Sequence, residues 1–404
     1  MKSWTVIDLF SGTGGMSYGF HSRKEFRLCG AVDVQAGKPS SGHGSLECNS
    51  SYQANIGIVP VAADLMKADP AELARTFGIS HNNPLTILSS CAPCTGFSRT
   101  LNKNHSQDDA RNSLVGRSAL FVREFKPAIF LMENARELIK GNFGHHYASL
   151  AKELEALGYR VHGGIHLLNR FGLPQLRERS LVIAVRRDLD LRTIDDLWQG
   201  YEVKTTATQV RRAIADMPKL KAGEVHAEDP LHASPMLGAV NMRRLKCIPK
   251  DGGSWADLRQ HSEKEAILTP AMLRYISQND FGSHPDVYGR MAWDKPAPTI
   301  KRECGHIGNG RYAHPEQDRL CTVRELAILQ GFPRTYQFVA RSAINKYRHI
   351  GDAVPPLISY QLSAVCKWIL TGEKPRIDDV ILKDTHLKRE DIVTLTRSQK
   401  SLFD

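Results

Sequence analysis

The sequence predicts an α/β fold with a doubly wound, mostly parallel sheet. Three observations support this prediction. Apolar runs of strand length alternate with helical stripes as far as about residue 187, polar or acidic residues directly follow several of the runs, and the alternation stops near Asp188. Beyond that point we expect a smaller, irregular domain.

The overall composition is that of a large globular protein. The chain has 404 residues, 41% of them hydrophobic, which suffices for two domains or for one large domain with insertions. No run approaches the roughly 18 apolar residues of a membrane span. The start of the chain lacks the apolar segment of a signal peptide. We therefore expect a soluble, cytoplasmic protein without a membrane partner.

The first strand is expected over Trp4–Phe10, and a glycine-rich turn, Ser11–Gly15, leads from it into a helix that begins near Met16. Glycines let the backbone pass close to a ligand, and free amides at a helix start suit an anion. A tight structural turn is the alternative. The spacing is not the Gly-x-Gly-x-x-Gly of dinucleotide-binding folds.

Two further strands are expected to end in acidic residues. The second, Leu28–Val34, carries Asp33 near its end, and the third, Val61–Asp64, ends on Asp64. Each carboxylate is placed either to bond ribose hydroxyls or to be a solvated strand end. The Gly-, Ser- and Pro-rich stretch 35–49 is typical of a flexible surface insertion.

A cysteine and an acid follow the next two strands. The run Leu85–Leu88 precedes Cys91-Ala-Pro-Cys94, and the run Ala128–Met132 ends in Glu133-Asn134. Adjacent parallel strands would place Cys94 and Glu133 at the same carboxyl edge, where open sheets hold ligands. A thiol nucleophile beside an acid suits covalent addition to an electron-poor ring.

A metal or redox role for the Cys91–Cys94 pair is disfavoured. A zinc site usually needs a second such pair, and a thioredoxin-type pair would open a helix. The residues after Cys94 are instead polar and loop-like as far as Ser113. We therefore predict no metal site from the sequence, and we expect the eight scattered cysteines to be thiols.

The remaining pattern completes the expected fold. Helical stripes are expected over 114–125 and 147–157, with Gly158 stopping the second. Two strands, 161–168 and 180–185, flank a turn that carries two arginines, Gln175–Arg179. Later helices are expected over 322–330 and from Val354 to about Leu370, followed by a polar tail.

The charge balance favours a polyanionic partner. Lys plus Arg number 54 against 43 Asp plus Glu, giving a net charge of +11. Basic clusters fall within the irregular region 188–288, at Arg211-Arg212 and at Arg243 to Lys246. We expect this region to contact nucleic acid, and a large solvated insertion is the alternative.

Taken in order, six motifs resemble those of the cytosine carbon-5 DNA methyltransferases. They are Asp8–Phe20, then Pro93-Cys94 with Phe97-Ser98 and Asp109–Arg111, then Glu133-Asn134, Gln175–Arg179, Arg319–Glu325 with Leu329–Pro333, and Gly351–Pro356. Any one of these motifs would be weak evidence. Six in sequence, separated by a variable region, are highly specific.

The resemblance implies a Rossmann-like fold, S-adenosylmethionine as methyl donor and S-adenosylhomocysteine as product. Cys94 would attack carbon 6 of a flipped-out cytosine, and Glu133 would support the ring at nitrogen 3. The arginines Arg177 and Arg179 would lower the pKa of the thiol and bind the base. Thr95, Ser98, Arg99, Arg111 and Gln175 would lie in the catalytic loop or near DNA.

The resemblance also implies the cofactor positions. They are Phe10, Ser11, Gly12, Thr13, Gly14, Gly15, Asp33, Val34, Asp64, Leu65, Asp352, Ala353 and Val354. Departures from the family pattern are Ala92 for a proline, Thr95 for a glutamine, Asp33 for a glutamate and Asp352 for an asparagine. The last puts a negative charge near the cofactor. Arg324 and Glu325 are expected to form a structural ion pair.

The expected domains are a catalytic and cofactor-binding domain (1–187), a variable target-recognition domain (188–288), a late-motif bridge (289–350) and a C-terminal helix with a polar tail (351–404). The expected partners are double-stranded DNA, read through the major groove, and a restriction endonuclease acting on the same site. We expect a monomer at the bacterial nucleoid. Methylation of transfer RNA and a non-catalytic DNA-binding role are the alternatives; a small-molecule substrate would not need the basic region.

Overall fold

The structure is a computed structural model that describes residues 3–36, 44–93, 113–142, 144–278 and 286–395. Its centre is a six-stranded sheet with the strand order β2-β1-β3-β4-β7-β5. Strand β7 runs antiparallel to both of its neighbours, and the other pairings are parallel. The strands are β1 (Trp4–Leu9), β2 (Phe26–Val32), β3 (Ile87–Ser90), β4 (Ile129–Ala135), β5 (Tyr159–Leu167) and β7 (Glu178–Arg186). The predicted doubly wound, mostly parallel sheet is confirmed.

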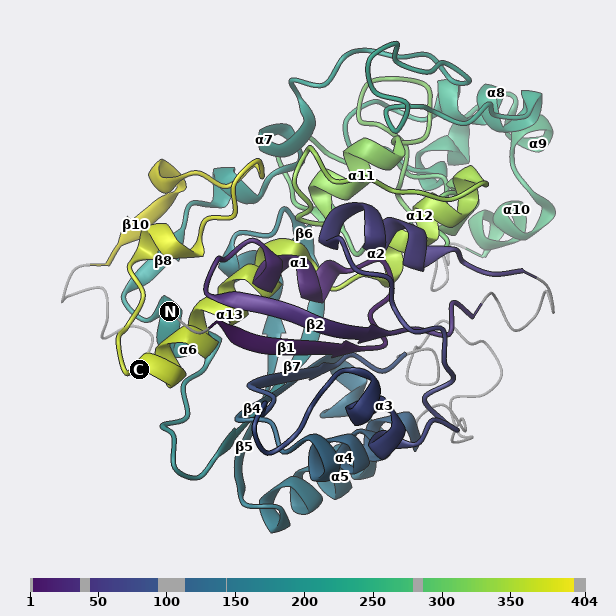
Figure 1. The fold of residues 1–404 in the computed structure, drawn as a ribbon. Helices are drawn as coiled ribbons and strands as arrows, with labels where there is room; N and C mark the ends of the chain where they lie inside the picture. Colours follow the sequence, from purple (N-terminus) through teal and green to yellow (C-terminus); the bar gives the residue numbers. More distant parts are fainter. Residues whose placement is uncertain (1–2, 37–43, 94–112, 143, 279–285, 396–404) are drawn as a thin grey trace.

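The central strands are apolar on both faces because helices cover both sides of the sheet. In β4, Ile129 and Leu131 join one apolar core, and the alternate residues Phe130 and Met132 join another. Figure 1 shows the two helical layers on opposite sides of the sheet. One layer contains α1 (Gly15–His21), α6 (Ile194–Trp198) and α13 (Pro356–Thr371), and the other contains α3 (Pro70–Thr76), α4 (Ser113–Phe125) and α5 (Gly144–Ala156).

A second region lies beyond one end of the sheet (Figure 1). Its main core gathers buried residues between Val210 and Ala353, and a satellite core lies between Ile248 and Met272. The helices of this region are α7 (Val210–Ile214), α8 (Ala239–Cys247), α9 (Lys264–Ile267), α10 (Pro270–Ser277), α11 (Val323–Leu329) and α12 (Ala343–Asp352). Strands β6 (Gln175–Leu176) and β9 (Ala297–Pro298) pair in parallel and join the two regions.

Arginines at the late motif hold this second region together. Glu325 caps α11 and receives two hydrogen bonds from buried Arg319, at 2.6 and 2.8 Å. The neighbouring Arg324 bonds instead to Asp229, at 2.6 and 3.1 Å. The expected Arg324–Glu325 pair is therefore wrong, because adjacent helical residues point in different directions and each finds its own partner.

The third predicted strand is wrong. Val61 makes one isolated bridge to Val32, and no strand extends through Asp64. The chain turns there because the Asp64 carboxylate accepts a hydrogen bond from Met66 N at 3.0 Å. The Gln175–Arg179 segment is likewise not a turn, since β6 and the start of β7 occupy it.

The tail after Gly372 is not merely polar. Five buried residues along it pack into the core of the sheet, namely Ile377, Val380, Leu382, Leu387 and Ile392. The strand β10 (Ile392–Thr394) pairs with β8 (Tyr201–Val203). The apolar residues of this tail are too sparse in a charged sequence to show a period. Their partners, such as Val203 opposite Ile392, are far away in the sequence.

The start of the predicted variable domain packs with the sheet. Buried side chains between Ile194 and Ala207 belong to the same core as α13, and the second region's core begins at Val210. The division of the chain into domains remains a prediction, and this packing favours a boundary near residue 209.

The described ends of the 35–49 insertion are anchored to α12 and to the chain just before it. Ser45 O accepts from Asn345 Nδ2 at 3.2 Å, and Leu46 O lies 2.6 Å from His349 Nε2. The Glu47 carboxylate accepts a hydrogen bond from Arg341 N at 2.9 Å. Its last residues, Cys48 and Asn49, begin α2 (Cys48–Ile56). Residues 37–43 lie outside the described part of the chain.

None of the helices within the described ranges combines the length and apolar character that a membrane span requires.

Candidate active site

The backbone of the glycine-rich turn after β1 is bonded to the carboxylate of Asp33, the residue that directly follows β2. Phe10 and Gly12 both have positive φ, at 59° and 51°. The Asp33 carboxylate accepts hydrogen bonds from Gly12 N at 2.9 Å and from Gln35 N at 2.6 Å. The sequence predicted Asp33 at a strand end, either bonding ribose hydroxyls or solvated, and the structure shows that its carboxylate also bonds to the backbone of the turn.

The glycines of the turn differ in their surroundings. A Cβ on Gly15 would lie 2.1 Å from Val354 O, and one on Gly14 would lie 3.1 Å from the Tyr52 ring and 3.1 Å from the Tyr336 hydroxyl. A Cβ on Gly12 would meet nothing within 4 Å. The turn is therefore packed tightly on one side, against the last motif, and open at Gly12.

Two hydroxyls of the same turn are left without a partner. Ser11 Oγ and Thr13 Oγ1 are both buried and make no hydrogen bond to any described residue. A buried hydroxyl without a partner is costly, so such groups usually await a ligand or water. Together with the open face of Gly12, they form a polar cradle.

A buried carboxylate lies beneath the turn. Asp8 in β1 accepts hydrogen bonds from Ser17 Oγ at 2.6 Å and from Ser89 Oγ at 2.5 Å. Burial raises the pKa of Asp8 to about 6, although these two hydrogen bonds oppose the rise. Sequence reasoning gave Asp8 no role.

Asp352, at the end of α12, forms an ion pair with Arg302 Nη1 at 3.1 Å. More than a third of its side chain is exposed, yet the surrounding protein raises the pKa of Asp352 to about 6. Desolvation is the main cause, and Asp33 and Glu303 contribute to the rise. The negative charge that Asp352 brings to this position is therefore paired with a nearby cation, Arg302.

The other expected cofactor positions differ in exposure. Val34 is exposed, whereas Leu65, Ala353 and Val354 are buried. Asp64 is occupied in capping the turn that follows it. No contact in the described chain joins Asp64 to the glycine turn.

The predicted acid and one predicted arginine meet. Glu133 in β4 is 8% exposed, and its Oε1 lies 3.0 Å from Arg179 Nε in the antiparallel neighbour β7. The register pairs Ala135 with Arg179, so the two side chains reach each other diagonally across the strands. The two groups form an ion pair, and Glu133 Oε1 makes no hydrogen bond to a described residue.

The chain that leads to Cys94 is fixed to the same strand. Cys91 Sγ accepts a hydrogen bond from Glu133 N at 3.4 Å, and Asn134 Nδ2 donates to Ala92 O at 3.0 Å. Burial raises the pKa of the Cys91 thiol well above its usual range, which disfavours the thiolate form of Cys91. Pro93, the last described residue of this segment, precedes Cys94 directly.

Five predicted residues lie outside the described ranges. These are Cys94, Thr95, Ser98, Arg99 and Arg111. Their roles remain predictions.

Gln175 and Arg177 are buried and make hydrogen bonds within the protein. The Gln175 amide bonds to Gln330 Oε1 at 2.7 Å and to Ile300 N at 2.9 Å, and its side chain is fully buried. Arg177 donates to the carbonyl oxygens of Ile300 and Ala353, at 3.1 and 3.3 Å. The expected DNA contact of Gln175 is therefore not supported, and Arg177 links β6 to the last motif.

The arginine clusters of the second region are also engaged within the protein. Arg211 pairs with Asp294 at 2.8 Å, Arg212 with Asp391 at 3.1 Å and Arg243 with Glu263 at 2.5 Å. Arg244 is buried and bonds to Asn241 at 2.8 Å. The side chains of Arg211, Arg212 and Arg243 nevertheless remain 36–53% exposed, so their expected contact with nucleic acid remains a prediction.

Sequence reasoning missed two residues that complete the site. Tyr336 donates a hydrogen bond to Thr13 O and packs on Gly14, and Arg302 pairs with Asp352. Neither residue follows a strand or belongs to a glycine-rich turn, so no local pattern marked them.

Solved structures of methyltransferases share the fold of this chain. A protein described as a putative DNA modification methyltransferase, encoded within a prophage of E. coli, has a similar structure, with a TM-score of 0.58 at 20% identity. The match covers 91% of this chain and 99% of that one. At this identity the likeness shows the fold alone.

The sequence comparisons define the family. The family profile of the C-5 cytosine-specific DNA methylases matches residues 4–368. The type II methylase M.HgiDII of Herpetosiphon aurantiacus is 33% identical, covering 93% of this chain and 99% of that protein. The type II methyltransferase M1.HphI of Haemophilus parahaemolyticus is 31% identical, covering 92% and 88%. The chain belongs to the C-5 cytosine-specific DNA methylase family, and it is an enzyme of this kind that uses S-adenosylmethionine.

The residues present fit this cofactor. S-adenosylmethionine carries ribose hydroxyls, an amine and a carboxylate, all of which need polar partners. The unpaired hydroxyls of Ser11 and Thr13, the open face of Gly12 and the Asp33 carboxylate supply such partners at one place.

Proposed function

We propose that this protein methylates carbon 5 of a flipped-out cytosine at specific sites in duplex DNA, through a covalent adduct with Cys94. The observation that carries this proposal is the Glu133–Arg179 pair, 3.0 Å apart, on the strand that also anchors the Cys91–Pro93 segment. The described segment that precedes Cys94 in the sequence is bonded to Glu133 N and to the Asn134 side chain, which supports a Cys94 nucleophile acting beside Glu133.

In the proposed mechanism the Cys94 thiolate forms a bond to carbon 6 of the cytosine. Glu133, held by Arg179, supports the ring at nitrogen 3, so that electron density moves to carbon 5. Bound S-adenosylmethionine supplies the methyl group. Loss of the carbon-5 proton to a base then returns the electron pair to the ring and expels Cys94 as a thiolate.

The cofactor is proposed to occupy the cradle between the glycine turn and the last motif. Ser11, Thr13 and Gly12 would bind its polar groups, and Asp33 would fix the turn while remaining near the ribose. Phe10, Gly14, Gly15 and the 352–354 segment would form the walls. Asp64 and Leu65 would lie at its far margin.

The catalytic loop and the second region are proposed to hold the DNA. Thr95, Ser98, Arg99 and Arg111 keep their predicted roles in the loop after Cys94. Residues from about 209 to 288 would read bases in the major groove, since they carry the family's variable segment. The type II names of the relatives support a partner endonuclease with the same recognition site. We also propose that the protein is a monomer and that it acts in the cytoplasm, at the nucleoid.

Two assays test this proposal. Purified protein with tritiated cofactor should label carbon 5 of cytosine in duplex DNA, and DNA containing 5-fluorocytosine should trap a covalent complex that Cys94→Ala abolishes. Labelling of adenine or of an exocyclic amine contradicts the mechanism. Preferred labelling of transfer RNA contradicts the substrate, and tight DNA binding without labelling or trapping supports a non-catalytic relative.

A further inference from the structure

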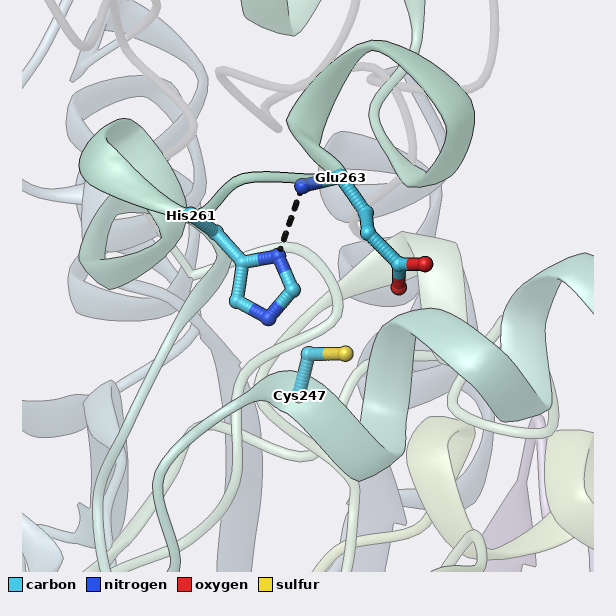
Figure 2. A group of neighbouring side chains, drawn as sticks. All are labelled: Cys247, His261 and Glu263. Carbon is cyan, nitrogen blue, oxygen red and sulfur yellow. Dashed lines mark hydrogen bonds between the residues drawn. The ribbon is translucent and has the colours of Figure 1, made fainter.

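Three metal-ligating side chains meet in the second region, away from the proposed active site. Cys247 ends α8, His261 follows the 3₁₀ helix η6 (Trp255–Gln260), and Glu263 precedes α9. Their ligand atoms all lie within 4.8 Å of one another. Figure 2 shows the thiol, the imidazole and the carboxylate turned toward one another. We propose that Cys247, His261 and Glu263 bind one Zn²⁺ ion.

The donor set selects the metal. A thiolate and an imidazole favour Zn²⁺ over Mg²⁺ or Ca²⁺, which prefer oxygen ligands. Three protein ligands at bond lengths of about 2.0–2.3 Å leave a fourth tetrahedral position for water. The thiolate and the carboxylate bring two negative charges to the ion, and the carboxylate is shared with Arg243.

One neighbouring contact supports this geometry, and another has to change when the ion binds. Arg243 bonds to Glu263 Oε1 at 2.5 Å, which leaves Oε2 for the metal and orients the carboxylate. Glu263 N lies 3.2 Å from His261 Nδ1, so the metal would take Nε2. On binding, the Nε2 proton would move to Nδ1, and this backbone contact would loosen.

The surroundings explain what such an ion would do. The satellite core beside the three side chains contains six buried residues, Ile248, Trp255, Leu258, Ile267, Leu268 and Met272. A core of this size gains much from a cross-link. The ion would tie the end of α8 to the start of α9, and so would rigidify the part of the chain proposed to read DNA. This site does not depend on methyl transfer.

The test is a Co²⁺ and Zn²⁺ titration of the full chain after treatment with a chelator. We expect one Co²⁺ per chain with a thiolate charge-transfer band and tetrahedral visible bands, displaced by Zn²⁺. Zn²⁺ should also raise the melting temperature. Cys247→Ser, Glu263→Gln and His261→Asn should each abolish the bands; asparagine can still accept the bond from Glu263 N.

Two control variants separate this site from other thiols. Cys29→Ser, at a partly buried thiol of β2, and Cys94→Ala should both keep the bands. Each variant is compared with its own metal-free melting temperature, so a loss of stability does not obscure the result. Absence of the charge-transfer band, its persistence in Cys247→Ser, or its loss in Cys94→Ala overturns the proposal.

Discussion

The proposed cofactor cradle and the basic clusters of the second region differ in how their polar side chains are bonded. Around the glycine turn, the buried hydroxyls of Ser11 and Thr13 have no partner among the described residues, and none of these residues lies near the open side of Gly12. In the second region, Arg211, Arg212, Arg243 and Arg244 all bond within the protein. The unpaired hydroxyls therefore support the proposed cofactor site, whereas the paired arginines do not by themselves mark a binding site.

The largest expected effect concerns the acid of the active site. Glu133→Gln keeps the size of the side chain but removes the charge that Arg179 orients, so methyl transfer should fall by roughly 10²–10⁴-fold. Single-turnover transfer to duplex DNA measures it. Glu178→Gln, one residue from Arg179, is the matched control and should retain activity. An active Glu133→Gln protein would remove this carboxylate from the proposed mechanism.

The next effect concerns a polar pair that is fully satisfied. Glu325→Ala leaves Arg319 buried without its partner, and the free energy of unfolding should fall by about 3–5 kcal/mol. Urea unfolding measures the change. The double variant Arg319→Met with Glu325→Leu should recover much of the loss. If Glu325→Ala is as stable as the wild type, the second region is not held by this pair.

The third effect is a dependence of stability on pH. Burial raises the pKa of Asp8 from 3.8 to about 6, so the ionised side chain destabilises the folded state above that pH. The penalty, about 3 kcal/mol at neutral pH, disappears as the pH falls from 6 toward 4. Asp8→Asn should therefore be more stable than the wild type near pH 7.5, and the difference should vanish near pH 4. A difference that is constant with pH would contradict the assignment.

A smaller effect tests the unpaired hydroxyls. Ser11→Ala should weaken cofactor binding about tenfold without reducing the stability of the free protein, because the hydroxyl has no partner to lose. Calorimetric titration and thermal unfolding measure the two quantities. Ser17→Ala is the contrasting variant and should lose stability, since Ser17 bonds to Asp8 and Tyr52. Unchanged cofactor affinity in Ser11→Ala would place the ligand elsewhere.

The smallest effect concerns the exposed arginines. Arg211→Ala should leave both the melting temperature and the salt dependence of DNA binding unchanged, because Arg211 pairs with Asp294 at the surface. If the slope of log affinity against log salt falls by about one in Arg211→Ala, then Arg211 contacts a DNA phosphate in the complex. Its ion pair with Asp294 would then break when DNA binds.

Most of the catalytic fold could be predicted because its signals are local. Strand periodicity, the glycine turn and the Thr322–Gln330 helix follow from short-range sterics and hydrogen bonding, and the structure places them within a few residues. The third strand failed because one capping carboxylate, Asp64, turns the chain. The tail failed because its apolar residues are too sparse to show a period.

The sequence alone determined the class of fold, the family motifs and the position of Asp33 and Glu133 at strand ends, because covalent neighbours and periodicity fix these features. Only the tertiary structure decided which polar and charged side chains contact one another. Arg179 reaches Glu133, Arg302 reaches Asp352, Tyr336 reaches the glycine turn and Cys247 reaches His261 because folding brings distant residues into contact. Such contacts depend on the packing of whole elements, which no local spacing encodes.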